Sequence, residues 1–315
     1  MASSSAVAAK VAFRAMLKRD FESQEAAVAH FRRILDMPFP APTPSGVSVD
    51  SISIAGVPCE RVAVPRPRMT VLHLHGGAFI GGKLRTYHPF AGGLAKRLRA
   101  EVILPDYRLA PEHPFPAAPE DCLAVYQTLL ECGVEPGRFA VTGDSAGGNL
   151  TLVTLQTARD MGMALPSCAV AISPGADISG QLPSWRENDR SDAMLSLSVI
   201  QKMAGAYLRD HPRDDPRASP LNGDFTGLPP LLLTVSDEEC LRDDAYAVAA
   251  KARAQGVRVE MLTRPDLPHA WPVLNALISE SRRDLARIAR FIGSLRGTVG
   301  CEQLAAPRGD VRMTE

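Results

Sequence analysis

The stretch that most constrains the fold is Gly-Asp-Ser-Ala-Gly at residues 143–147. The β-favouring residues 139–142 precede it and a helix-favouring run, 149–160, follows it, so this part of the chain predicts a strand, a sharp turn and a helix. Gly143 and Gly147 flank Ser145, and neighbours without a Cβ let the strand and the helix approach closely across such a turn. We therefore expect the Ser145 hydroxyl at the carboxyl end of the strand, beside the N–H of Ala146 and the positive end of the helix.

Strand and helix patterns alternate along most of the chain. Short β-favouring runs occupy residues 71–74, 101–105, 139–142, 169–173, 231–235 and 257–262, and helical runs such as 90–99, 119–130 and 243–255 lie between most of them. This alternation predicts a mostly parallel sheet with helices on both faces. Residues 47–54 and 57–64 predict a β-hairpin, with a bulge where the apolar alternation slips. The expected fold class is therefore α/β, with about eight strands.

Three segments fall outside this alternation. Residues 1–45 carry two helical patterns, the second with Ser23 as its N-cap, and a proline run over 38–44 ends them. Residues 175–225 are too many for a simple connection and show helical spacing, which favours an inserted cap over the alternative of a disordered insertion. The predicted organisation is N-terminal cap helices at 1–45, an α/β core at 46–174 and 226–296, the inserted cap at 175–225 and a flexible tail at 297–315.

Composition argues against several classes of function. The 35 basic and 35 acidic residues form no long block of one sign, so neither nucleic acid nor an anionic membrane surface is an expected partner. No apolar run reaches the length of about 18 residues that a membrane-spanning helix needs, and the N-terminus lacks the apolar stretch of a signal peptide. The six cysteines form no Cys-x-x-Cys or Cys/His cluster, which argues against a zinc site or a disulfide framework. We expect a reduced, cytoplasmic protein.

A glycine-rich turn follows the strand expected at 71–74. His75, Gly76, Gly77 and Ala78 stand there, and adjacent N–H groups in such a turn can point to one spot, as an acyl-transfer oxyanion requires. Together with the N–H of Ala146 they would supply donors from two separate loops. We expect the ring of His75 to order this loop through hydrogen bonds.

A serine nucleophile needs a base and an acid. Of the seven histidines, His269 alone lies in a loop just after a late strand, which fits the chain order Ser, acid, His. Asp144, next to Ser145, is expected to fix the turn by hydrogen bonding. The acid is ambiguous from the residues alone, because several carboxylates follow the strand at 231–235: Asp237, Glu238, Glu239 and Asp243.

Three motifs together resemble those of the bacterial hormone-sensitive lipase family, also called family IV, of α/β-hydrolase esterases. They are His-Gly-Gly-Ala-Phe at 75–79, Asp-Tyr-Arg-Leu-Ala-Pro-Glu-His-Pro-Phe-Pro-Ala at 106–117 and Gly-Asp-Ser-Ala-Gly-Gly-Asn at 143–149. The resemblance implies an α/β-hydrolase fold with a helical cap, hydrolysis of short-chain carboxylic esters, and no metal or cofactor. It also implies a homodimer paired through an edge strand.

The resemblance narrows the choice of acid. The family usually reads Asp-Pro-Leu-Arg-Asp there, and matching its last three residues to Leu241-Arg242-Asp243 gives Glu239 the place of the acid, with Asp237 as the alternative. This chain departs from the family's pattern at three places: Cys240 replaces the proline, Ala78 the third glycine of the turn, and Ala270-Trp271 the usual Gly-Phe after the histidine.

The predicted function is therefore a serine carboxylesterase that uses Ser145, Glu239 and His269 as a triad and the N–H groups of Gly76, Gly77, Ala78 and Ala146 as an oxyanion hole. One alternative keeps the triad and changes the substrate to a lactone or an acetylated small molecule. Another is a non-catalytic ligand-binding protein on the same fold, as in the plant gibberellin receptor, which has lost its catalytic histidine.

Overall fold

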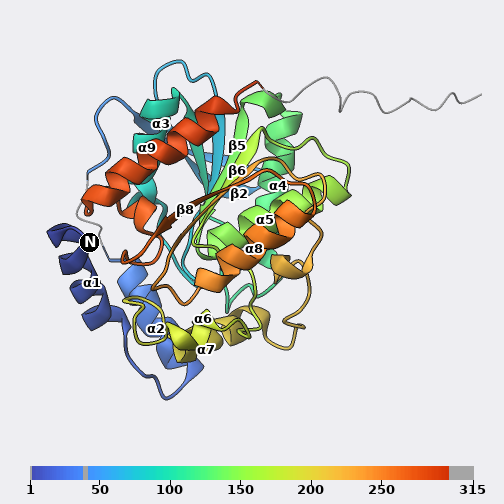
Figure 1. Ribbon diagram of the computed structural model, residues 1–315. Coiled ribbons are helices and arrows are strands. Elements are labelled where there is room, and N and C mark those ends of the chain that lie inside the picture. The colour runs from blue at the N-terminus through green and yellow to red at the C-terminus, as the bar shows by residue number, and fades with distance from the viewer. Residues whose placement is uncertain (1, 38–41, 298–315) are drawn as a thin grey trace, which may run out of the picture.

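The computed structural model describes residues 2–37 and 42–297, and an eight-stranded sheet with the order β1-β2-β4-β3-β5-β6-β7-β8 runs through it (Figure 1). The strands are β1 Ser48–Ile54, β2 Val57–Ala63, β3 Thr70–Leu74, β4 Glu101–Pro105, β5 Phe139–Asp144, β6 Cys168–Ile172, β7 Leu231–Ser236 and β8 Val259–Arg264. Strand β2 pairs antiparallel with β1 and β4, and all other neighbours are parallel. The predicted α/β class is confirmed.

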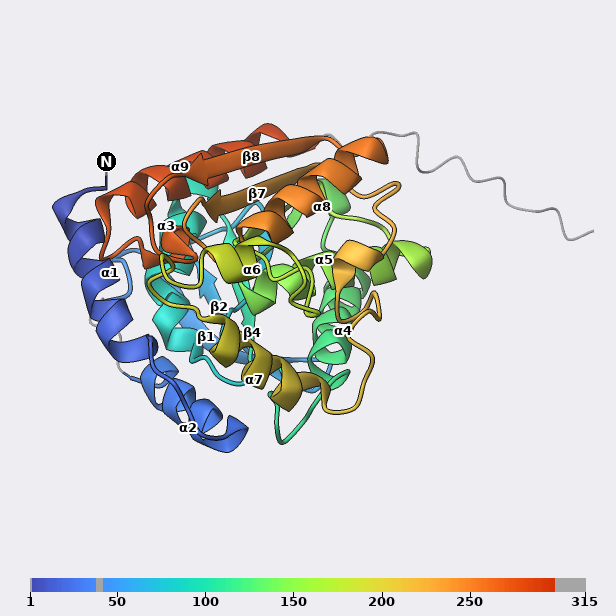
Figure 2. The same ribbon diagram turned by 60° about the horizontal axis from the view of Figure 1, so that its bottom comes forward.

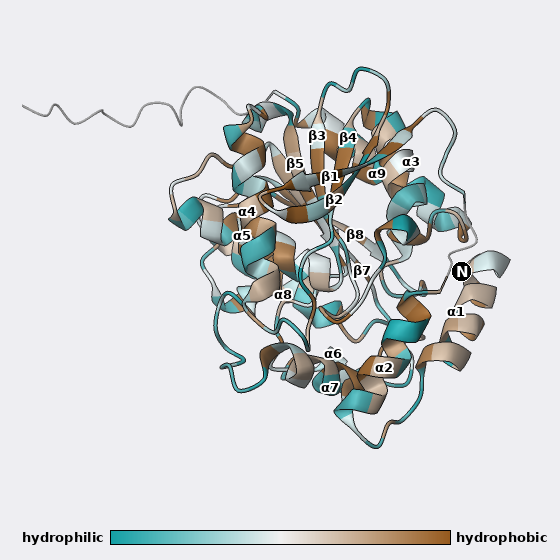
Figure 3. Cartoon of the chain, turned by 180° about the vertical axis from the view of Figure 1, so that it is seen from behind, coloured by the Kyte–Doolittle hydropathy of each residue, from teal (hydrophilic) through white to brown (hydrophobic). Residues whose placement is uncertain are grey.

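Helices cover both faces of this sheet. One face packs against α3 His88–Leu98 and α9 Ser279–Ser294, and the other against α4 Ala117–Glu131, α5 Ala146–Asp160 and α8 Arg242–Ala254 (Figure 1). Every residue of β3, β5, β6 and β7 is buried, and the brown colour of β3, β4 and β5 in Figure 3 reflects their apolar sequences. Parallel strands read as continuous apolar runs because both of their faces are covered.

The predicted hairpin is present, but the predicted bulge is wrong. Pairing between β1 and β2 runs without a break from Ser48 opposite Ala63 to Ile54 opposite Val57. Strand β1 lies at the edge of the sheet and is exposed along most of its length, so its side chains need not alternate strictly between apolar and polar.

Strand β8 begins at Val259, two residues later than the pattern predicts. The N–H of Val257 instead bonds the carbonyl of Ala252, at 2.9 Å, and so closes the C-terminus of α8. The buried Val257 side chain therefore marks the end of a helix, although its apolar character suggests a strand.

Four helices lie over the carboxyl ends of the parallel strands: α1 Ser4–Leu17, α2 Gln24–Leu35, α6 Ser184–Glu187 and α7 Leu197–Leu208 (Figure 2). The N-cap prediction is confirmed, since Ser23 Oγ accepts the N–H of Ala26 at 3.1 Å. The structure describes all of residues 175–225, which contain α6, α7 and the 3-10 turn η3 Pro220–Asn222. Short 3-10 turns also lie at η1 Leu84–Tyr87, η2 Pro136–Arg138 and η4 Trp271–Leu274.

The predicted domain boundaries stay predictions. Part of the proline run, 38–41, and nearly all of the predicted tail, 298–315, lie outside the described residues. Within the described ranges, none of the helices has both the length and the apolar character that crossing a membrane requires.

Candidate active site

Ser145 lies on the turn between β5 and α5, as the sequence predicts. Its backbone has φ 54° and ψ −118°, a conformation that L-residues rarely adopt. A Cβ added to Gly143 would lie 2.1 Å from the carbonyl oxygen of Gly147, and one added to Gly147 would lie 1.9 Å from that of Leu74. Only glycine fits at both flanks, and the strained turn presents Ser145 to a cavity at this end of the sheet.

His269 lies in the loop after β8 and pairs with Glu239. Its ring Nδ1 is 2.6 Å from Oε2 of Glu239, and the two side chains are buried. A carboxylate can only accept, so Nδ1 carries the proton and Nε2 is left as the acceptor. No described residue hydrogen-bonds to that Nε2. The pair therefore has the geometry of an oriented general base.

Asp237, the alternative acid, lies apart from this pair. Its side chain is exposed and accepts a 3.3 Å hydrogen bond from the hydroxyl of Tyr246. The structure thus brings Glu239, and not Asp237, to His269.

Ser173 is a residue of the site that sequence reasoning missed. Its Oγ donates to Oε1 of Glu239 at 2.9 Å and accepts the N–H of Ala270 at 3.2 Å, so it ties the acid to the histidine loop. The N–H of Ser236 donates to the same Oε1 at 2.7 Å. The one available signal was position, because Ser173 directly follows β6, the neighbour of the strand that carries Ser145.

Electrostatics at the pair favour a charged histidine. Burial by itself lowers the pKa of His269, but the hydrogen bond to Glu239 and the charges of Glu239, Asp192 and Asp144 outweigh it, so the pKa lies above its ordinary value. Burial raises the pKa of Glu239, against the opposing effect of His269. An imidazolium formed during catalysis would therefore be stabilised by three surrounding carboxylates.

The glycine-rich turn offers two free N–H donors. Gly77, Ala78 and Phe79 have φ of 126°, 53° and 62°, and a Cβ on Gly77 would lie 2.0 Å from the carbonyl oxygen of Gly81. The N–H groups of Gly77 and Ala78 bond to none of the described residues, nor does that of Ala146 at the first position of α5. These three N–H groups are candidate donors to an oxyanion.

Gly76 does not fit the predicted set of donors. Its N–H donates to the hydroxyl of Tyr87 at 2.9 Å and to Oδ1 of Asp144 at 3.0 Å. The Tyr87 hydroxyl in turn donates to Oδ2 of Asp144 at 3.1 Å. The N–H of Gly76 is therefore occupied, and the hydrogen bonds of Asp144 tie the turn at Ser145 to the glycine-rich turn.

His75 orders the same loop from a buried position. Its Nδ1 donates to the carbonyl of Gly76 at 2.7 Å, and its ring stacks on Tyr107 with centroids 4.2 Å apart. The Tyr107 hydroxyl donates to the carbonyl of His75 at 2.7 Å. Burial lowers the pKa of His75, which keeps the ring neutral.

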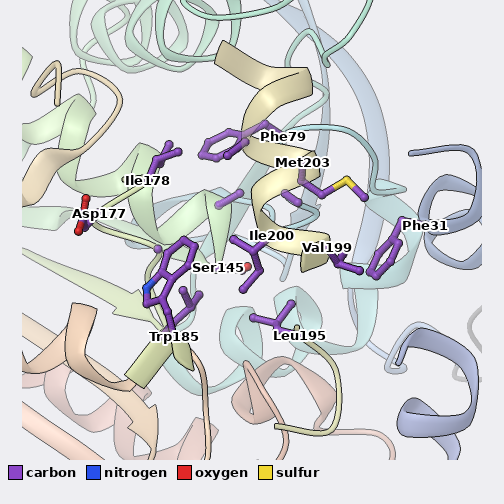
Figure 4. Close-up of a pocket in the computed structure, with 15 residues that line it drawn as sticks. Phe31, Phe79, Ser145, Asp177, Ile178, Trp185, Leu195, Val199, Ile200 and Met203 are labelled. Atoms are coloured by element: carbon purple, nitrogen blue, oxygen red, sulfur yellow. The ribbon is translucent and has the colours of Figure 1, made fainter. Parts of the chain in front are cut away.

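An apolar cavity opens over Ser145 (Figure 4). Its wall combines residues of the glycine-rich turn, of α2, α5, α6 and α7, and of the loops after β6, before α7 and before α8. They are Phe31, Ala78, Phe79, Ala146, Gly175, Asp177, Ile178, Trp185, Leu195, Val199, Ile200, Met203, Ala204 and Leu241. The ring of Phe79 stacks on that of Tyr207, with ring centroids 3.8 Å apart, and this contact fixes one side of the wall. Within the described residues, no group of three His, Cys, Asp or Glu side chains is placed to hold a metal ion.

The sequence of this chain is similar to those of known hydrolases. Residues 71–273 match the model of a family described by the alpha/beta hydrolase fold. An acetyl-hydrolase of Streptomyces hygroscopicus is 39% identical over 72% of this chain and 76% of its own length. The carboxylesterase NlhH of Mycobacterium tuberculosis strain H37Rv is 36% identical over 70% of this chain and 73% of its own length.

A solved structure is similar over almost the whole chain. It is the crystal structure of an esterase from the bacterial hormone-sensitive lipase family, 33% identical, with a TM-score of 0.87 over 94% of this chain and 100% of that one. The chain therefore belongs to the bacterial hormone-sensitive lipase family of α/β-hydrolases and is a carboxylic ester hydrolase.

Proposed function

We propose that this protein hydrolyses carboxylic esters with short acyl chains through an acyl-enzyme on Ser145. The observation that carries the proposal is the buried Glu239–His269 pair, in which Nε2 of His269 has no hydrogen-bond partner among the described residues. Strands β5, β7 and β8 run parallel, so the residues that follow them lie together at the carboxyl end of the sheet, beneath the cap.

The reaction proceeds in two similar halves. Ser145 attacks the ester carbonyl while His269 takes its proton, and Glu239 stabilises the imidazolium that forms. The N–H groups of Gly77, Ala78 and Ala146 hold the oxyanion. The alcohol leaves with the proton from His269. In the second half His269 takes a proton from water, which attacks the acyl-enzyme, and the acid is released as Ser145 regains its proton.

The cavity supports a preference for short acyl chains. Trp185, Ile200 and Met203 of the cap helices lie around Ser145 in Figure 4 and leave an apolar space that large side chains bound. Hydrolysis of a lactone or of an acetylated small molecule would form the same kind of oxyanion intermediate. The similarity to an acetyl-hydrolase favours an acetyl ester as one such substrate.

A series of p-nitrophenyl esters from acetate to decanoate tests this function. We expect kcat/KM to be highest at acetate or butyrate and to fall with longer chains, because the bulky cap residues block them. A maximum at decanoate would refute the short-chain preference. Absence of hydrolysis by folded protein across the whole series would refute the proposed esterase and favour the ligand-binding alternative.

The pH dependence should report the state of His269. The neutral ring accepts the Ser145 proton, so activity is present above the histidine pKa and is lost as pH falls through it. Because the surrounding carboxylates raise that pKa, we expect the midpoint of the rising limb of kcat/KM above the ordinary histidine value of about 6.5. A pH–rate profile measures this midpoint, and one clearly below the ordinary value would contradict the electrostatics described above.

Two expectations from the sequence stay predictions. Strands β1 and β8 form the two edges of the sheet, and the expected homodimer would pair through an edge strand. The expected cytoplasmic location is likewise untested.

A further inference from the structure

The turn that carries Glu239 is held by side chains of the cap. Asn188 Nδ2 donates to the carbonyls of Asp237 and Glu239, both at 2.8 Å, and Ser191 Oγ donates to that of Glu238 at 3.2 Å. These bonds cross from the segment after α6 to the loop after β7, and the residues that they join lie 47 to 51 positions apart in the chain. The acid turn therefore depends on the cap for its shape.

Asp192 contributes the one carboxylate among these cap side chains. It is 2% exposed, and its Oδ2 accepts the N–H of Cys240, the residue after Glu239, at 2.9 Å. Its Oδ1 accepts the N–H groups of Met194 at 2.8 Å and Leu195 at 2.9 Å. No ion pair joins Asp192 to a described lysine, arginine or histidine. Its buried carboxylate is instead compensated by three backbone N–H groups and by the thiol of Cys240.

The two oxygens of Asp192 thus bind two different parts of the site. Leu195 lines the cavity over Ser145, and Cys240 adjoins the triad acid. A shift of the cavity wall at Leu195 would be transmitted through one carboxylate to the backbone next to Glu239.

The charge of Asp192 also acts on His269. Three carboxylates act electrostatically on that ring: Glu239, which is hydrogen-bonded to it, Asp192 of the cap and Asp144 of the nucleophile turn. Each favours the imidazolium and thereby raises the pKa of His269, although burial opposes them.

We propose that Asp192 is a positioning residue of the ester hydrolysis, which joins the cap wall of the substrate cavity to the acid turn and helps to stabilise the charged His269. This inference rests on the proposed triad. It assigns to the cap a part in catalysis in addition to its part in shaping the cavity.

Two substitutions separate the two effects of Asp192. Asp192→Asn removes the charge and replaces one of the two accepting oxygens with an amide NH2 group, which cannot accept a hydrogen bond. The remaining oxygen can accept either from the N–H of Cys240 or from those of Met194 and Leu195, so one of these two sets of bonds is lost. Cys240→Pro removes that N–H and leaves the charge of Asp192 in place. Cys240 stands where the resembled family has proline, so the turn is a suitable place for that ring.

We expect both variants to lose kcat for p-nitrophenyl butyrate by on the order of tenfold, because a misaligned acid orients the histidine poorly. In Asp192→Asn the rising limb of the pH–rate profile should also move to lower pH, since one of the charges that favour the imidazolium of His269 is gone. In Cys240→Pro that limb should stay where it is in the wild type.

Asp121→Asn provides the matched control for loss of a buried carboxylate. Asp121 lies on α4, where its carboxylate accepts from the backbone N–H and the guanidinium of Arg108, and no described hydrogen bond joins it to Ser145, Glu239 or His269. This variant should unfold at a lower temperature than the wild type. Its kcat and the position of the rising limb of its pH–rate profile should equal those of the wild type. Thermal unfolding of all variants checks that the assayed protein is folded.

The possible outcomes separate a positioning role of Asp192 from a purely structural one. A folded Asp192→Asn variant overturns the proposal if its kcat equals that of the wild type or if the rising limb of its pH–rate profile does not move. If that variant does not fold, Cys240→Pro decides: a kcat equal to the wild type overturns the proposal, and the expected loss supports it. A wild type without esterase activity would instead refute the proposed function itself.

Discussion

Ser145→Ala is expected to lower kcat for p-nitrophenyl acetate by on the order of a million-fold, the scale of removing the nucleophile of a triad. The cavity, the N–H donors of Gly77 and Ala78 and the Glu239–His269 pair would remain, but no acyl-enzyme could form. Alanine adopts the strained backbone of this turn as readily as serine does, so the fold should persist. Any residual hydrolysis would come from the oxyanion hole alone, and its rate would exceed that of the uncatalysed reaction in water by about a thousandfold.

Ser167→Ala is the matched control for this change. Ser167 also lies next to a strand terminus and is buried there. Its Oγ donates to the carbonyl of Phe139 at 2.8 Å, at the opposite end of β5 from Ser145. Steady-state kinetics and thermal unfolding should show wild-type activity for Ser167→Ala and loss of activity without unfolding for Ser145→Ala. Activity of Ser145→Ala within tenfold of the wild type would mean that another group attacks the ester.

The features predicted well from the sequence are those that depend on local geometry. Gly143 and Gly147 are required by contacts of about 2 Å that any Cβ would make, so the turn around Ser145 could be read from the chain. Buried parallel strands are apolar along their whole length, which made β3, β5, β6 and β7 recognisable. The edge strand β1 was misread in detail because both of its faces are largely exposed.

The features missed depend on contacts between distant segments. The N–H of Gly76 is taken by Tyr87 and Asp144, and nothing local to the glycine turn indicates those partners. Asp192 and Ser173 reach the acid turn from 48 and 66 residues away along the chain. Polar side chains in loops have no periodicity, so only the folded structure shows which of them meet.

Glu239→Ala is expected to reduce kcat by on the order of ten thousand-fold, which corresponds to about 5 kcal/mol of transition-state stabilisation. Without the carboxylate, Nδ1 of His269 has no acceptor, so the tautomer with a free Nε2 is no longer favoured and the imidazolium loses its counter-charge. Glu239→Gln should lose activity for the same reason, because the neutral amide cannot balance the charge on His269.

Asp237→Ala is the control that the chain itself provides, two residues away on the same turn. Among the described residues, its exposed carboxylate accepts only a 3.3 Å bond from the hydroxyl of Tyr246. The kinetic constants and the unfolding temperature should therefore both stay near those of the wild type. The opposite pattern, with activity retained in Glu239→Ala and lost in Asp237→Ala, would show that the turn rearranges when substrate binds and that Asp237 is the acid. Loss of activity in both variants would show that the turn as a whole, more than one carboxylate, orients His269.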